Sequence, residues 1–115
     1  MRIQKIKPQF EDQRGTIREL VLPDRACKVT FIGCNHSSIR GGHYHKKYSE
    51  EFIVVSGFLR ADISRQHEAR FNATLGPGDF IKIHPFEKHT FTALTDAVLM
   101  KFNYPGEDLQ KDTFK

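Results

Sequence analysis

Apolar residues along this chain form short runs separated by turn residues, with no helical repeat. Short runs rich in β-branched and aromatic residues and bounded by Gly, Pro, Asn or Asp are typical of strands. The strongest turn signal is Gly76-Pro77-Gly78-Asp79. The pattern predicts an all-β fold with no helix longer than about two turns. We expect a small closed barrel, because closure removes exposed sheet edges. The expected strands cover residues 16–22, 27–34, 52–55, 58–64, 70–75, 80–83, 90–94 and 97–103.

The length of 115 residues leaves room for one domain with one modest core. We expect a single domain over residues 1–115, with its core at about 14–104 and a polar tail at 105–115 as an appendage. Phenylalanines are expected to fill most of the core, with one or two of them lining a ligand pocket: Phe10, Phe31, Phe52, Phe58, Phe80, Phe91 and Phe102.

The net charge of +4 and the pI near 9.2 raise the question of a nucleic-acid partner. The basic residues are scattered among Asp and Glu, without a basic helix or a basic–aromatic repeat, so we expect none. A solvated, mildly basic surface accounts for this charge, and a local positive field that attracts an anionic small molecule is the functional alternative.

The chain has no long apolar run, so no membrane span is expected, and its first residues lack the apolar stretch of a signal peptide. Cys27 and Cys34 are its only cysteines, and without a disulfide framework they indicate free thiols in a reducing compartment. We therefore expect a cytoplasmic protein.

Four residues have the chemistry of a metal site: His43, His45, Glu50 and His89. Residues two apart on an extended chain point to the same side, so His43 and His45 can aim both imidazoles at one point. Three imidazoles and one carboxylate suit a divalent transition metal, with Zn, Mn, Fe, Ni and Co about equally compatible. Each histidine alone could be an ordinary strand residue, but the joint spacing favours metal binding.

At these positions the chain resembles the cupin superfamily of small jelly-roll barrels. The first cupin motif, His-x-His followed by Glu and Gly, is matched by His43, His45, Glu50 and Gly57; the second, Gly-Asp through Pro to His, by Gly78, Asp79, Pro85 and His89. The resemblance implies a jelly roll with the metal ligands inside. Three departures leave the expected ligands in place: Ser37 for a glycine, Pro85 one residue later than is common, and Ala93 for an asparagine.

A narrower resemblance rests on residues 12–17 and 39–47, which are similar to small cupins of nucleotide-sugar and capsular-polysaccharide pathways. These include sugar 3,5-epimerases, 3,4-ketoisomerases and the metal-binding cupin domain attached to some capsular reductases. The epimerases and ketoisomerases hold a 4-keto nucleotide sugar and move protons with histidines, without a metal. Their residue at the position of Glu50 is usually not acidic, so Glu50 favours the metal-binding branch.

The resemblance implies an isomerase or epimerase that acts on a sugar or nucleotide-sugar. His43, His45 or Tyr48 would carry the proton, and Arg40 would grip a phosphate of an anionic sugar substrate. Two alternatives stay open: an Fe(II)-dependent dioxygenase, and a non-catalytic binding module that a metal stabilises.

The strand over residues 52–55 also predicts a homodimer. Phe52 and Val54 alternate with Ile53 and Val55, so both faces of this strand are apolar and only one can fill a core. A second copy of the chain would cover the other face.

Overall fold

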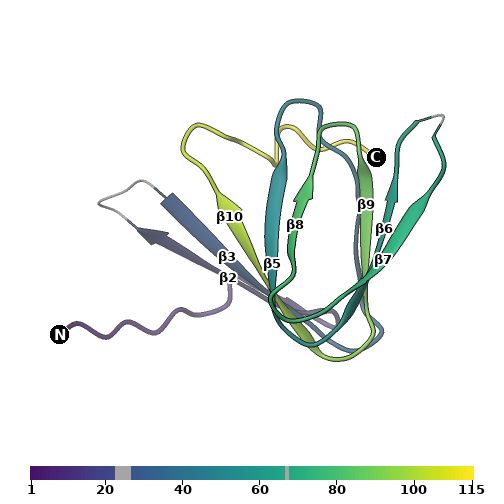
Figure 1. The fold of residues 1–115 in the computed structure, drawn as a ribbon. Coiled ribbons are helices and arrows are strands. Elements are labelled where there is room, and N and C mark those ends of the chain that lie inside the picture. The colour runs from purple at the N-terminus through teal and green to yellow at the C-terminus, as the bar shows by residue number, and fades with distance from the viewer. Residues whose placement is uncertain (23–26, 67) are drawn as a thin grey trace.

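A computed structural model of the chain describes residues 1–22, 27–66 and 68–115. These residues form strands, turns and loops, so none of them belongs to a helix that could span a membrane. The all-β prediction is confirmed (Figure 1). The ten strands are β1 (Phe10–Asp12), β2 (Gly15–Leu22), β3 (Cys27–Cys34), β4 (Ile39–His43), β5 (Glu50–Ser56), β6 (Leu59–Ser64), β7 (Phe71–Leu75), β8 (Phe80–Ile83), β9 (Lys88–Ala93) and β10 (Ala97–Asn103).

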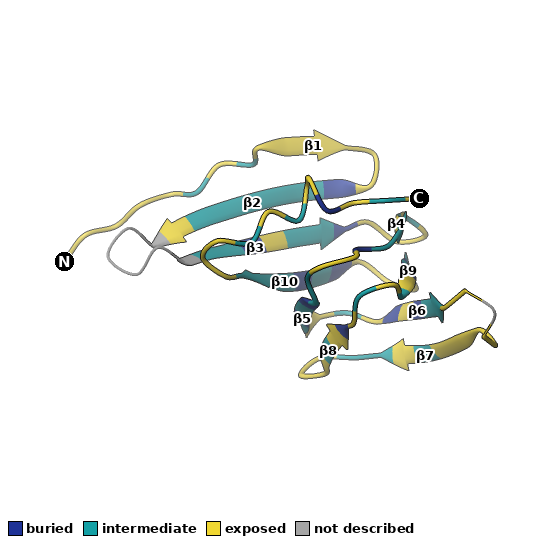
Figure 2. Ribbon diagram, turned by 90° about the horizontal axis from the view of Figure 1, so that it is seen from above, coloured by how far each residue is buried: buried dark blue, intermediate teal, exposed yellow. Residues whose placement is uncertain are grey.

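The strands make two antiparallel sheets. One has six strands in the order β1-β2-β3-β10-β5-β8, and the other has four in the order β4-β9-β6-β7. No strand ladder joins the two sheets within the described residues, so the expectation of a closed barrel is corrected. The short, fully exposed strand β1 ends the larger sheet, as Figure 2 shows. A short edge strand limits pairing with other chains, even though the sheet does not close into a barrel.

The strand pattern was largely predictable, because each apolar run is bounded by turn residues. Strands β3, β8 and β10 have the expected bounds, and the other expected strands are shifted at one or both ends. Strand β1 was not expected, and β4 was expected only as a strand that carries both His43 and His45, without its start at Ile39. Strand β1 is only three residues long, too short for an apolar period to be visible, and β4 contains Gly41 and Gly42.

The core lies between the sheets and follows the alternation of side chains along each strand. On β5, Phe52 and Val54 are buried, while Val55 is 49% exposed. The Phe52 ring meets Phe91 of β9 edge to face at 5.3 Å between centroids. The other buried hydrophobic residues are Cys34, Leu59, Ala61, Ile83, Ala93, Ala97 and Leu99. Cys34 is a free thiol, as expected, and the side chain of Cys27 lies outside the described part of the structure.

Phenylalanine supplies less of the core than expected. Phe52 and Phe91 are buried, but Phe10, Phe31, Phe58 and Phe80 are exposed and Phe102 is half-buried. The physical reason on β3, β5 and β10 is register. Phe31, Ile53, Met100 and Phe102 alternate with inward-facing residues and therefore lie on the outer face of the larger sheet.

The tail at residues 105–115 is no appendage, which corrects the expectation from its polar sequence. Tyr44 and Phe114 form an isolated bridge, with N–O distances of 2.8 and 3.0 Å. Asp112 is buried, and its carboxylate accepts hydrogen bonds from the backbone N–H groups of Lys46, Lys47 and Tyr48 at 2.8–3.1 Å. The tail is therefore fastened to the loop that follows β4.

Gly57 occupies a position that other residues cannot fill. Its φ is +76°, and an added Cβ would lie 2.1 Å from the backbone oxygen of Asp96. Gly78 also has a positive φ, +89°, but open space where a Cβ would be. We predict that Gly57→Ala lowers the free energy of unfolding by about 3 kcal/mol or more, since backbone strain and overpacking add.

Gly78→Ala is the matched control, because it introduces the backbone strain without the clash. It should lose only about 1 kcal/mol. Urea unfolding followed by circular dichroism measures both, and equal losses would contradict this account of Gly57.

Candidate metal centre

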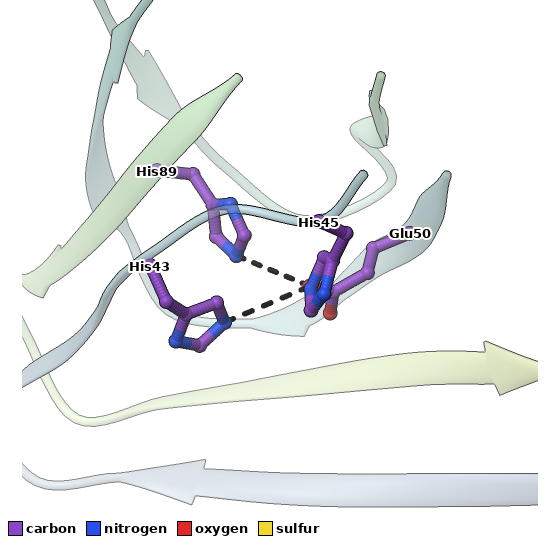
Figure 3. A group of neighbouring side chains, drawn as sticks. All are labelled: His43, His45, Glu50 and His89. Atoms are coloured by element: carbon purple, nitrogen blue, oxygen red, sulfur yellow. Dashed lines mark hydrogen bonds and ion pairs between the residues drawn. The ribbon is translucent and has the colours of Figure 1, made fainter. Parts of the chain in front are cut away.

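Three segments bring the expected ligands together between the sheets (Figure 3). His43 is the last residue of β4, and the register of β4 with β9 pairs it with His89 across an irregularity after Gly41. Glu50 begins β5 in the opposite sheet. His45 lies two residues beyond His43, just after β4 rather than on the same strand as expected. The four side chains offer ligand atoms that all lie within 4.8 Å of one another.

The carboxylate of Glu50 is the centre of this group. Its Oε1 lies 3.2 Å from Nε2 of His89 and 3.7 Å from Nε2 of His43, and it accepts a hydrogen bond from Nε2 of His45. His45, Glu50 and His89 are buried, while the His43 side chain is 31% exposed. His43 therefore marks the side of the group that a small molecule can reach.

The far nitrogens of two imidazoles are held by backbone carbonyls. Nδ1 of His45 donates to the oxygen of Asp112, and Nδ1 of His89 donates to the oxygen of Glu87 at 3.3 Å. A carbonyl only accepts, so each Nδ1 carries a proton, and an Nε2 that gives up its own proton turns a lone pair towards the centre of the group. This arrangement is the one found around metal-ligating histidines, and the donor set fits a divalent transition metal.

Burial and hydrogen bonding act in opposite directions on these groups. Burial alone would raise the pKa of Glu50, but hydrogen bonds from His43, His45 and His89 and the charge of Lys101 hold that pKa well below its ordinary value. Burial alone would lower the pKa of His45, but its bonds to Glu50 and to the Asp112 carbonyl raise it. Glu50 is therefore ionised, which is the form that binds a metal.

Lys101 is a member of the site that the sequence did not single out. It lies on β10, and its Nζ is 3.4 Å from Oε2 of Glu50 with the side chain 21% exposed. A signal was present, because Lys101 falls on the same side of its strand as Ala97 and Leu99. A lysine among inward-facing apolar residues indicates a buried partner of opposite charge.

A cavity of about 230 Å³ opens beside His43, Glu50 and His89. Arg40 lines it, as do Arg14 and Lys101, so the wall carries three cations besides the histidines. The Arg40 guanidinium is anchored by a bond from Nη2 to the Gly33 oxygen at 3.1 Å. Tyr48 is placed elsewhere, in a separate hollow against Asp108, Lys111 and Phe114 of the tail.

The structure is similar to solved cupins. It superposes on the capsular polysaccharide assembling protein CapF of Staphylococcus aureus with a TM-score of 0.80 at 24% identity, covering 97% of this chain and 32% of CapF. It superposes on oxalate decarboxylase of Bacillus subtilis with a TM-score of 0.76 at 22% identity, covering 96% of this chain and 30% of that one. At these identities the likeness establishes the fold, and it confirms the expected jelly roll.

Sequence comparison finds a matching family and a similar reductase. The chain is 34% identical over 53 residues to a UDP-2-acetamido-2,6-beta-L-arabino-hexul-4-ose reductase of Pseudomonas aeruginosa strain PA103, a match that covers 46% of this chain and 14% of the reductase. The chain thus spans about a third or less of these relatives. The family described as "Polysaccharide biosynthesis C-terminal domain" matches residues 10–113. With nearly its whole length matched, this chain belongs to the polysaccharide biosynthesis C-terminal domain family, on a cupin fold.

Proposed function

We propose that the chain is a metal-binding cupin that isomerises or epimerises a sugar or nucleotide-sugar in polysaccharide biosynthesis. The observation that carries the proposal is the convergence of His43, His45, Glu50 and His89 beside a cavity with a cationic wall. The reductase relative supports the substrate class, since its name specifies a UDP-linked hexul-4-ose. A ketone of that kind makes the hydrogen on the neighbouring carbon removable.

In this proposal His43, His45, Glu50 and His89 hold one divalent ion, whose identity among Zn, Mn, Fe, Ni and Co the donor set does not decide. Such an ion, when bound, supplies Lewis-acid polarisation of a substrate oxygen. His45 is engaged at both nitrogens, so its part is to ligate. A metal-free version, in which His43 and His45 carry the proton, uses the same cavity, and the metal content of active protein separates the two.

The remaining cavity residues suit an anionic keto sugar. Arg40 can bind an acidic group of the substrate through paired N–H donors, and its anchored guanidinium loses little freedom in doing so. The Lys101 ammonium faces the cavity, where it can donate to an oxygen that gains charge as the neighbouring C–H proton leaves. Epimerisation returns a proton to the opposite face of the same carbon, so no oxidant or reductant is needed. Tyr48 has no part in this scheme, because it lines another hollow.

Deuterium exchange tests the proposed activity. In D2O, the protein should place deuterium on the carbon next to the ketone of a UDP-linked 4-keto hexose. NMR measures the rate at which this deuterium is incorporated. Glu50→Gln should slow the exchange by at least about a hundredfold, because the ligand charge is lost. Glu51→Gln is the matched control on the outer face of the same strand and should leave the rate unchanged.

Three results would overturn this function. Exchange that is equally fast in Glu50→Gln would remove the proposed centre from the reaction. Substrate-dependent O2 uptake without exchange would favour the dioxygenase, and binding of the sugar with neither reaction would favour the binding module.

Asp112 is predicted to tune the metal centre from outside it. Its carboxylate holds three N–H groups of the loop after His45, and its own carbonyl accepts from the His45 ring. Asp112→Ala keeps the backbone carbonyl but should release the loop and so loosen the carbonyl that orients the His45 ring, weakening divalent-metal affinity by about 10- to 100-fold in competition with a chromophoric chelator. Asp108→Ala, an exposed residue of the same tail, is the control. Equal affinities in a folded Asp112→Ala protein would show that the tail does not position His45.

The homodimer also stays a proposal. A row of apolar side chains crosses the outer face of the larger sheet through register pairs: Phe31 beside Met100, Met100 beside Ile53, and Ile53 beside Phe80. Phe31 is 37% and Phe80 is 56% exposed, so a second copy has apolar surface to cover. Light scattering at micromolar concentration should give twice 13.3 kDa, and Phe31→Lys should shift the mass towards one chain. A wild-type mass of 13.3 kDa would contradict the dimer.

A further inference from the structure

A second and larger hollow, of about 680 Å³, lies against the segment that carries the first two histidines. Tyr44 lines this hollow, whereas His43 lines the metal-side cavity, and the two hollows share no lining residue. The separation follows from the extended backbone, in which successive side chains point to opposite sides. The hollow also contains Phe86, together with the cations Lys46, Arg65 and Lys88.

Phe86 stands where its turn favours a glycine. The backbone N–H of Glu87 donates to the oxygen of His84 at 3.2 Å, which closes a turn with Pro85 second and Phe86 third. Phe86 has a φ of +68°, a conformation that costs a bulky residue free energy. Phe86 is 52% exposed, so burial does not account for a phenylalanine here. The turn presents an aromatic face at the hollow, near-parallel to Tyr44 at 26° and 6.2 Å between centroids.

Two of the cations around these rings are held in place by contacts that involve no acidic group. Nη2 of Arg65 donates to the Pro85 oxygen at 3.3 Å, directly beside Phe86. Nζ of Lys46 lies 4.1 Å above the ring of Phe114. Within the described residues, Lys46, Arg65 and Lys88 form no ion pair. Glu68 is the one acidic side chain of the lining. The hollow therefore combines a stacking surface with an excess of positive charge.

We propose that this hollow binds a nucleoside phosphate, with the base stacked on Phe86 and the phosphates against Lys46, Arg65 and Lys88. Aromatic side chains stack on any base, and arginine and lysine bind phosphate oxygens. Its volume falls within the range of about 300–1,000 Å³ usual for small-molecule sites. The same chemistry is offered by a free nucleotide and by the nucleotide end of a nucleotide-linked sugar. The site needs no metal and stands independently of the activity proposed above.

Isothermal titration with UDP, uridine, inorganic pyrophosphate and a UDP-linked hexose tests the site on the intact chain. UDP should bind at least about tenfold more tightly than uridine or pyrophosphate, because it alone makes both kinds of contact. UDP-hexose binding as tight as UDP identifies the nucleotide end of a linked sugar as a ligand, and much weaker binding identifies the free nucleotide. Equal affinity for UDP and pyrophosphate would overturn the proposal, leaving a simple phosphate site.

Substitutions at Phe86 separate binding from folding. Phe86→Gly should weaken UDP binding by about tenfold or more, since the stacking surface is lost, while the melting temperature stays the same or rises as the strain is relieved. Phe71→Ala, an exposed phenylalanine outside the hollow, should leave UDP binding unchanged. Lys88→Ala should weaken UDP binding and reduce its salt dependence, and Lys47→Ala, which lies outside this hollow, should not.

A chelator distinguishes this proposal from the metal centre. UDP binding that persists in chelator, with the Phe86→Gly loss intact, supports the hollow even if the proposed sugar chemistry fails. UDP binding that disappears on chelation, or whose affinity is unchanged in Phe86→Gly, would place the nucleotide elsewhere and overturn the inference.

Discussion

A buried carboxylate between two sheets is the constraint on which the rest of this structure depends. Glu50 is 3% exposed, and an unpaired charge at that depth is strongly unfavourable. Its partners come from both sheets: His43 and His89 from the smaller one, Lys101 from the larger one, and His45 from the loop that follows β4. The same side chains that satisfy Glu50 make a donor set for a divalent ion, so stability and proposed function rest on one cluster.

The segment from His43 to Lys46 serves two sides of the molecule. Alternation sends His43 to the cluster and Tyr44 to the larger hollow, while the tail fixes the segment through Phe114 and Asp112. A change on one side therefore acts on the other through a short piece of backbone. Phe86 is linked to the same piece of backbone, because its N–H donates to the oxygen of His45 at 2.6 Å.

Local spacing explains what could be predicted. The strands, the four clustered residues and the turn at Pro85 follow from short sequence patterns whose geometry is fixed by strand alternation and turn chemistry. What could not be predicted depends on pairing over long sequence distances. From the sequence, Asp112 is indistinguishable from a solvated residue until its loop partners at 46–48 are known. Which phenylalanines point outward is decided by the face that each sheet turns towards the other. Closure of a barrel is likewise a property of whole-sheet geometry.

X-ray absorption at the metal edge, on protein purified without chelators, tests the central claim most directly. The account predicts one divalent ion per chain, with three imidazole nitrogens and one carboxylate oxygen at about 2.0–2.2 Å and one imidazole fewer in His89→Ala. A spectrum without imidazole scattering, or one unchanged by His89→Ala, would contradict the assignment of His43, His45, Glu50 and His89 as the ligands.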